Sequence, residues 1–197
     1  MIFIFVGMDS PLISYLQLFR PLGEEDGTLL TDAFEFRTLK EGDTLFRGGS
    51  VCREMFFVCK GVLRILAANA KGQDVTHYFL GENQFCTILH SFNEGGIAEE
   101  TIQAACEAEV LAITRAKLVD LYKKIPYLQA LIDQITQQRL LDKIRIRNAY
   151  LGQDAVTRYK LFMMRQPEIA LRVSLKDIAS YLEITPQSLS RIRKNLQ

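Results

Sequence analysis

Residues 173–197 read VSLKDIASYLEITPQSLSRIRKNLQ, which is the pattern of two short helices joined by a tight turn. Ser174 is a suitable N-cap for the first helix, and Asp177 three residues later completes a capping-box pattern. Thr185 and Pro186 suit the N-cap and the first position of the second helix. The apolar face of the first helix comprises Leu175, Ile178, Ala179 and Leu182. The segment therefore predicts a helix-turn-helix.

The second helix of this segment has an apolar side and a polar side. Its polar side combines Arg, which can make paired hydrogen bonds to guanine, with Gln, which can read adenine. The apolar side is formed by Leu189, Ile192 and Leu196. We predict that the helix enters the major groove of DNA, and an ordinary helical hairpin with a solvated basic face is the alternative. The residues predicted to contact DNA are Thr185, Gln187, Ser188, Ser190, Arg191, Arg193 and Lys194.

Charge is distributed unevenly along the 197 residues, although the formal net charge is only +1. From residue 139 onward the chain has 12 Lys and Arg against 5 Asp and Glu, a balance of +7. The preceding residues hold the other 12 of the 24 basic residues and 18 of the 23 acidic residues, a balance of −6. This asymmetry predicts that only the C-terminal part meets a polyanion.

The composition is that of a soluble globular protein, with 48% hydrophobic and 24% charged residues. The four cysteines form no C-x-x-C pair and no metal-ligand spacing, so we expect thiols in a reducing cytoplasm, with no metal and no cofactor. The apolar leader MIFIFVG (residues 1–7) is too short to span a bilayer, and no membrane partner is predicted. Whether it forms an extra strand or a leader before Met8 stays open.

Short apolar runs separated by Gly-containing turns occupy residues 34–114. The runs are FEFRTL, TLF, EMFFVC, VLRIL, DVTHYFL, TIQAAC and EVLAIT. Many short strands with Gly at the corners predict an antiparallel sandwich or small barrel. Residues 10–19 and 24–34 have helical patterns and precede the strands. The predicted fold class is therefore α+β, with helices flanking an antiparallel β unit.

A long helix is predicted from residue 127 to about residue 150, because this stretch contains no Gly or Pro. Its apolar stripe is longer than one small barrel can cover, so we predict pairing with the same helix of a second copy. Packing along its own domain is the alternative. The residues predicted at the seam are Leu128, Leu131, Ile132 and Ile135. Asp at Leu131 and Ile135 is then expected to give monomers.

These parts, in this order, resemble the Crp–Fnr family of bacterial transcription regulators. LKEGDTLFRGGSVCREMFFVCKGVLRIL (39–66) is similar to the family's cyclic-nucleotide-binding β-roll, a double-stranded β-helix, with Gly at its corners. IASYLEITPQSLSRIRK (178–194) is similar to its helix-turn-helix, and the long helix to its dimerisation helix. The resemblance implies an effector domain at residues 8–125, a dimerisation helix at 126–150 and a winged helix-turn-helix at 151–197.

By this resemblance the protein is expected to be a cytoplasmic regulator that binds double-stranded DNA as a homodimer and contacts RNA polymerase. Glu183 departs from the family, which usually has Gly at the turn between the two helices. A non-Gly residue is strained there if its φ is positive. A β-roll that acts through protein partners, with a weakened helix-turn-helix, is the alternative function.

The family's ligand cassette combines a Gly-rich turn, a Glu for the ribose, and an Arg followed by a small polar residue for the cyclic phosphate. Here it reads GENQFCTILHSFNEGGIAEETIQA (81–104), which places Ala98 at the Arg position and Thr87 at the Glu position. The implied pocket residues are Gly81, Glu82, Phe85, Thr87, Ala98, Glu99 and Glu100. A phosphate among carboxylates is disfavoured, so cyclic AMP is not expected to bind. Another small-molecule effector is left open.

Enzyme chemistry has no supporting motif in this sequence. There are two histidines, His77 and His90, and no H-x-H, G-x-S-x-G or G-x-x-x-x-G-K pattern. No cysteine precedes Cys52, which argues against an iron–sulfur centre near the N-terminus. A haem ligand at either histidine is left open. The protein is predicted not to be an enzyme.

Overall fold

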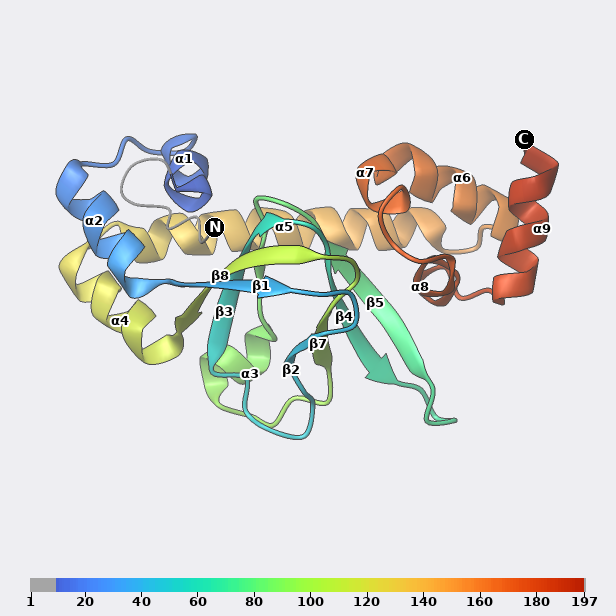
Figure 1. Cartoon of the computed structure of the whole chain (residues 1–197), viewed down its shortest axis with the longest axis horizontal. Helices are drawn as coiled ribbons and strands as arrows, with labels where there is room; N and C mark the ends of the chain where they lie inside the picture. The colour runs from blue at the N-terminus through green and yellow to red at the C-terminus, as the bar shows by residue number, and fades with distance from the viewer. Residues whose placement is uncertain (1–9, 197) are drawn as a thin grey trace.

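The computed structural model describes residues 10–196, and strands form the middle of this range (Figure 1). Helices α1 (Pro11–Gln17) and α2 (Glu24–Ala33) precede them. The strands are β1 (Glu35–Leu39), β2 (Thr44–Phe46), β3 (Glu54–Lys60), β4 (Leu63–Ala68), β5 (Asp74–Leu80), β6 (Phe85–Cys86), β7 (Thr101–Ala104) and β8 (Ala108–Thr114). The remaining helices are α3 (Leu89–Glu94), α4 (Arg115–Lys124), α5 (Leu128–Tyr150), α6 (Ala155–Arg165), α7 (Pro167–Ala170), α8 (Leu175–Tyr181) and α9 (Pro186–Leu196).

The strands form two four-stranded sheets in the orders β1-β8-β3-β6 and β2-β7-β4-β5, and all their pairings are antiparallel. β3 is buried on both faces, because successive side chains of a strand point to opposite sides. Phe56 packs in the core between the sheets, and Phe57 packs in a second core beneath the N-terminal helices. The predicted α+β fold with an antiparallel β-roll is confirmed.

Gly61 makes the tight connection between β3 and β4. Its φ is +89°, and a Cβ at this position would lie 2.2 Å from the carbonyl oxygen of Glu107. Only Gly fits such a close approach of two backbones in the left-handed region. This turn directs β4 across to the second sheet, whose outer strand β5 faces the C-terminal helices.

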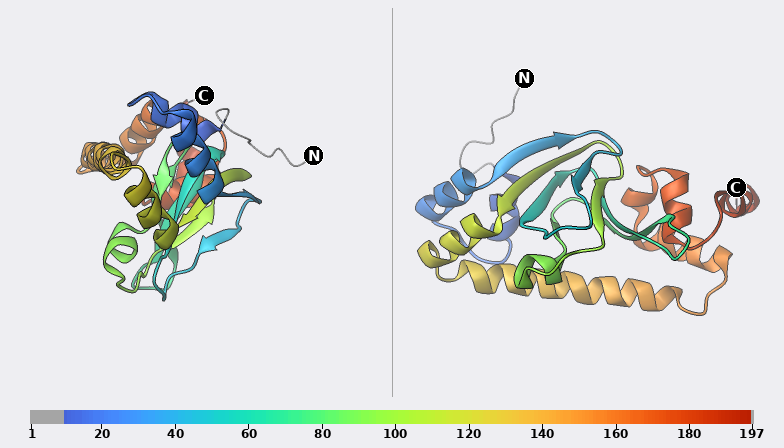
Figure 2. Two further views of the ribbon diagram at one scale, coloured as in Figure 1. Left: turned by 90° about the vertical axis from the view of Figure 1, so that its left-hand side faces the viewer. Right: turned by 90° about the horizontal axis from the view of Figure 1, so that it is seen from below.

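Helix α5 spans 23 residues and runs lengthwise from the N-terminal helices toward the C-terminal helices, as the right-hand view of Figure 2 shows. Its first turns are buried in the core that also contains α1, α2 and β3. The four residues predicted at a dimer seam lie in this core, and their exposed fractions are 0 to 6% (Leu128, Leu131, Ile132 and Ile135). That assignment is wrong, because the outer face of the β-roll covers this part of the stripe. The exposed apolar residues lie further along the helix.

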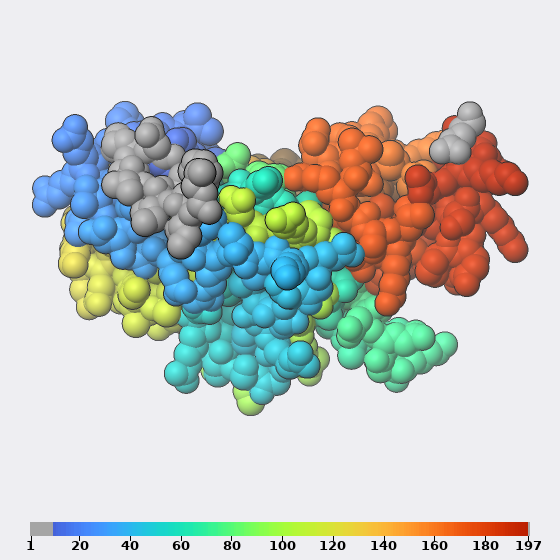
Figure 3. Space-filling model, viewed as in Figure 1, coloured from blue at the N-terminus to red at the C-terminus, as the bar shows by residue number. Residues whose placement is uncertain are grey.

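A third core joins the C-terminal helices to the β-roll. Val62, Phe79 and Ala105 of the roll pack with residues of α6, α8 and α9, among them Phe162 and Leu189. Figure 3 shows the result, with the N-terminal helices in blue at one end, the C-terminal helices in red at the other and strands between them.

The described chain from Arg115 to Leu196 contains helices and loops only, so the strands of a wing are not found in it. Among the described residues, no helix is both long enough and apolar enough to cross a membrane. The domain boundaries at 125/126 and 150/151 stay predictions. The leader at residues 1–7, whose role was left open above, lies outside the described residues.

Candidate nucleic-acid interface and ligand pockets

Helix α8, the first of the two predicted C-terminal helices, begins at the predicted N-cap, but the Asp177 side chain does not complete the predicted capping box. The Asp177 N–H donates to Ser174 Oγ at 3.1 Å, which confirms the N-cap. The Asp177 carboxylate forms an ion pair with Arg64 of β4. No hydrogen bond from the Ser174 N–H to this carboxylate is present among the described residues. The capping box is therefore half formed, and its carboxylate holds α8 against the roll.

The turn between α8 and α9 has the hydrogen bonds of a Schellman motif. The Ile184 N–H donates to the Ala179 carbonyl at 3.0 Å, and the Glu183 N–H donates to the Ser180 carbonyl at 3.1 Å. This motif places its C′ residue in the left-handed region, and Glu183 has a φ of +56°. A non-Gly residue in this conformation is strained by roughly 1–2 kcal/mol. The positive φ predicted for a Gly-like turn is thus present, with Glu occupying it.

The second helix, α9, is capped by Thr185, whose Oγ1 accepts from the Ser188 N–H at 3.1 Å. Leu189 and Ile192 are buried beneath the helix, with exposed fractions of 0 and 9%. The predicted contact residues Gln187, Ser190, Arg191 and Lys194 are exposed, Thr185 is exposed at the helix start, and Ser188 and Arg193 are half-buried. Leu175 and Leu196 also belong to the predicted apolar faces, but they are 39 and 44% exposed at the first residue of α8 and the last residue of α9.

The exposed face of α9 has cations without internal partners. Arg191, Arg193 and Lys194 form no ion pair among the described residues. The same helix carries no acidic residue in its first turn, where Asp or Glu commonly occur. An uncompensated basic face above an apolar one is the electrostatic requirement for contact with a phosphate backbone.

The residues of the predicted ligand cassette are dispersed. Ala98 is fully buried and pairs with Ser50, with its N–H donating to the Ser50 carbonyl at 3.0 Å. The Thr87 hydroxyl donates to the Glu54 carbonyl at 2.8 Å, and Phe85 packs on Phe57 with ring centroids 5.2 Å apart. Ala98 and Thr87 are buried, Phe85 is half-buried, and none of the three lines either of the pockets described below, so their assignment to a ligand pocket stays a prediction.

Glu82 is also used for structure. Its carboxylate accepts from the Gly61 N–H at 2.7 Å and forms an ion pair with Arg172, which follows α7. The hydrogen bond from Arg172 is the main cause that lowers the pKa of Glu82. Glu82 therefore links the β-roll to the C-terminal helices, a role that requires the tertiary structure to detect.

The remaining cassette residues, Glu99 and Glu100, line a small pocket of about 320 Å³. Its other lining residues are Ala67, His77, His90 and Ile97. No Lys or Arg is among these described residues, so the pocket offers a phosphate two carboxylates and no permanent cation. Groups of His, Cys, Asp and Glu able to hold a metal ion do not occur in the described chain.

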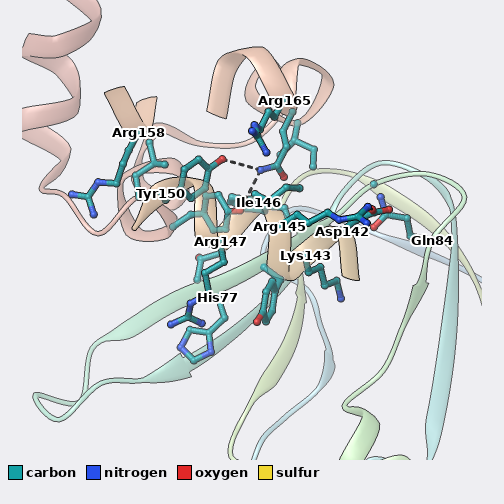
Figure 4. Close-up of a pocket in the computed structure, with 18 of the residues that line it drawn as sticks. His77, Gln84, Asp142, Lys143, Arg145, Ile146, Arg147, Tyr150, Arg158 and Arg165 are labelled. Carbon is teal, nitrogen blue, oxygen red and sulfur yellow. Dashed lines mark hydrogen bonds and ion pairs between the residues drawn. The ribbon is translucent and has the colours of Figure 1, made fainter. Parts of the chain in front are cut away.

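A larger cleft of about 790 Å³ lies between β5, the end of α5, and α6 and α7 (Figure 4). Its lining includes Gly81 and Glu82 as well as Tyr150 and Tyr181. Both tyrosine hydroxyls accept hydrogen bonds from Gln166 Nε2, at 3.4 and 3.2 Å. Local sequence patterns do not reveal this cleft, because its lining comes from separate segments between Val75 and Glu183. The excess of basic residues after residue 139 is the one sequence feature described above that coincides with it.

Comparison with known proteins agrees with this architecture. The cyclic nucleotide-binding domain family matches residues 36–124. No curated protein sequence matches the chain significantly. A transcriptional regulator of the Crp/Fnr family from Eubacterium rectale is 19% identical with a TM-score of 0.70, over 93% of this chain and 88% of that chain. CLP of Xanthomonas campestris, a c-di-GMP responsive global regulator, is 18% identical with a TM-score of 0.69, over 89% of this chain and 92% of that one.

A third similar structure is a mutant of CooA from Carboxydothermus hydrogenoformans. It is 17% identical with a TM-score of 0.68, and the match covers 96% of this chain and 85% of CooA. At these identities the similarity shows the fold, a cyclic nucleotide-binding β-roll with the helical arrangement of Crp/Fnr regulators.

Proposed function

We propose that this protein is a sequence-specific DNA-binding transcription regulator that acts as a homodimer in the cytoplasm. The observation that carries the proposal is the division of α9, where Gln187, Arg191 and Lys194 are exposed above the buried Leu189 and Ile192. Packing therefore does not explain the polar residues. The Crp/Fnr-like fold and the excess of basic residues in this part of the chain support the same conclusion.

Each exposed side chain of α9 has an expected role on DNA. Arg191 reads a guanine, and Gln187, one turn earlier, reads the neighbouring base pair. Ser188, Ser190 and the backbone N–H groups at the helix start contact phosphate, and the Thr185 cap fixes the direction of that start. Arg193 and Lys194 add sequence-independent attraction to the backbone.

The second half of α5 supplies the proposed dimer seam. Leu140, Leu141 and Ile144 are 43, 44 and 46% exposed although they are apolar. The exposed residues Gln137, Leu141, Ile144 and Asn148 follow one another along α5 at steps of four, three and four residues. This is the spacing of a coiled-coil seam. Helix α5 itself runs along the lower edge of the molecule in the right-hand view of Figure 2. Two-fold pairing would bury it and present two reading helices.

We propose further that cyclic AMP is not the effector. The small pocket has Glu99 and Glu100 and no Arg, which supports exclusion of a cyclic phosphate. One similar protein is described as c-di-GMP responsive, so small-molecule control is compatible with the fold. For this chain an effector of the small pocket would be neutral or cationic. RNA polymerase is the expected protein partner at a promoter.

Selection of bound DNA from a random pool tests the proposal. The expected result is enrichment of a two-fold symmetric sequence with half-sites about one helical turn apart. A gel shift with enriched and scrambled DNA then measures specificity. Failure to enrich any sequence, with the protein folded and dimeric, would overturn the DNA-binding proposal.

A second candidate is a β-roll that acts through protein partners. The left-handed Glu183 favours it, since strain at the turn weakens the helix-turn-helix. The Schellman hydrogen bonds nevertheless form, and the face of α9 is complete. The same gel shift separates the two candidates, because the second predicts no preference for the enriched DNA.

A further inference from the structure

The cleft between the β-roll and the C-terminal helices is a site that the proposed function does not use. Its volume of about 790 Å³ falls within the range of roughly 300–1,000 Å³ that is common for small-ligand sites. Its walls come from β5, the last turns of α5, and α6 with α7 (Figure 4). A ligand in the cleft would therefore contact the β-roll and the C-terminal helices at the same time.

Cations outnumber carboxylates along the cleft. Seven Lys and Arg line it against four Asp and Glu, a surplus of 7 − 4 = 3. Two of the carboxylates are already paired, Glu82 with Arg172 and Asp142 with Arg145. Arg147 and Arg165 are exposed and form no ion pair with any described residue. A concave surface on which charges of one sign are in excess attracts ligands of the opposite sign.

Arg158 adds a donor that lacks an acceptor. It lines the cleft, and its Nε is buried without a hydrogen-bond partner in the described part of the chain. Buried polar groups are nearly always hydrogen-bonded in native proteins, so an unmatched cationic donor beside a cleft indicates an external acceptor. An oxyanion is the acceptor that a guanidinium binds best.

The cleft also has an aromatic wall. The rings of Tyr150 and Tyr181 meet edge to face with centroids 6.0 Å apart, and Phe79 lies 5.1 Å from Tyr181. Burial raises the pKa of both phenols, so both are neutral at physiological pH. Neutral aromatic side chains suit a planar heterocycle, which can pack against their rings.

We propose that this cleft binds a nucleotide with at least two phosphate charges, with the arginines Arg147, Arg158 and Arg165 on the phosphates and the base beside Tyr150 and Tyr181. Nucleoside diphosphates and cyclic dinucleotides share this chemistry. In the close-up, Arg147 extends toward His77 of β5, while Arg165 lies across the cleft on α6 (Figure 4). The small pocket at Glu99 has the opposite charge and adjoins the cleft, since His77 lines both.

A nucleotide in this position stabilises the docked arrangement of the two units, because its contacts are lost if they separate. Its binding does not depend on DNA binding. An effect on DNA affinity would follow only if the proposed function holds, so the two ideas can fail independently.

Calorimetric titration of the full chain tests the site without DNA. The probes are GDP, ADP and cyclic di-GMP, with guanosine and pyrophosphate as the separate halves. We expect at least one of the three nucleotides to bind with a micromolar Kd and each half to bind at least about tenfold more weakly. Arg147→Ala and Arg165→Ala should each weaken nucleotide binding by about tenfold or more, because each removes a charge-assisted hydrogen bond.

Two matched controls locate the ligand. Arg53→Ala removes an exposed arginine that does not line the cleft and should leave binding unchanged. Ala67→Trp fills the small pocket and should also leave it unchanged. The proposal is overturned if no nucleotide binds below millimolar concentration, if the two arginine variants bind like Arg53→Ala, or if Ala67→Trp abolishes binding. Thermal unfolding confirms that each variant is folded.

Discussion

Arg64 of β4 and Asp177 of α8 form an ion pair that fastens the β-roll to the first helix of the helix-turn-helix. Their side chains are 16 and 9% exposed, and Arg64 also donates to the Gln103 side chain at 2.9 and 2.6 Å. Nearby, the Thr76 N–H donates to Ser180 Oγ at 2.9 Å. The orientation of α8, and of α9 that follows it, is thus fixed by groups on the β-roll.

Breaking this pair should destabilise the protein strongly. Asp177→Ala leaves Arg64 largely buried without its counter-charge, so we expect a loss of about 3 kcal/mol in the free energy of unfolding. Urea denaturation measures it. The exposed pair of Lys123 and Asp120 is the control, and Asp120→Ala should cost less than about 1 kcal/mol. Equal effects of the two variants would show that the Arg64 pair is not buried in solution.

Charge at Leu141 and Ile144 should separate the dimer and leave the subunit folded. Both side chains are about half exposed in one chain, so Asp there disrupts only a seam with a second copy. Sedimentation of Leu141→Asp/Ile144→Asp should show folded monomer. Val119→Asp, an equally exposed apolar site on α4, should remain dimeric. In contrast, Leu131→Ala should lower the free energy of unfolding by about 2–5 kcal/mol, because Leu131 is in the core.

Substitutions of Arg191 and of Lys194 should change DNA binding in different ways. Arg191→Ala should cost about 1–3 kcal/mol per half-site and relax the base preference at one symmetric pair of positions. Lys194→Ala should weaken binding to selected and scrambled DNA alike and lower the salt slope by roughly one unit per site. Titrations of both variants across a salt series measure this. If Arg191→Ala weakens both DNAs equally, Arg191 contacts phosphate only.

Acid should release the contact between Glu82 and Arg172. The pKa of Glu82 is lowered in the folded state, so its stabilisation is present above the unfolded pKa of about 4.3 and is lost as pH falls through the lower folded pKa. The melting temperature of Glu82→Gln should be lower than that of the unmodified protein at pH 7, and the two should converge as the pH falls below the folded-state pKa of Glu82. A constant difference across this range would assign the effect to packing rather than charge.

Cyclic AMP should not bind at physiological concentrations. Ala98 occupies the position of the expected Arg and is buried, while Glu99 and Glu100 line the small pocket. Calorimetry with cyclic AMP should give no heat of binding at micromolar ligand. A micromolar dissociation constant, on the order of −8 kcal/mol, would contradict this reading of the cassette, provided that Ala67→Trp removes it.

The sequence predicted the elements well because their signals are local. Short apolar runs between Gly-containing turns marked the strands, and the caps at Ser174 and Thr185 marked α8 and α9. The dimer seam was misplaced, since an apolar stripe at Leu128 to Ile135 does not say whether the β-roll or a second copy covers it. The ion pair of Glu82 was not predicted for a similar reason. Its partner Arg172 is 90 residues away, and no local pattern records such a pairing.

Val62, Phe79 and Ala105 share a core with the C-terminal helices. The β-roll and the C-terminal helices are therefore not independent domains joined by a linker. Phe79 is 6% exposed and Val62 is fully buried only because the two units are in contact. Movement of the C-terminal helices away from the roll would expose Phe79 to water. Such a reorientation is therefore a partial unfolding step rather than a free hinge motion. Movement of α8 and α9 relative to the β-roll therefore requires this shared core to open.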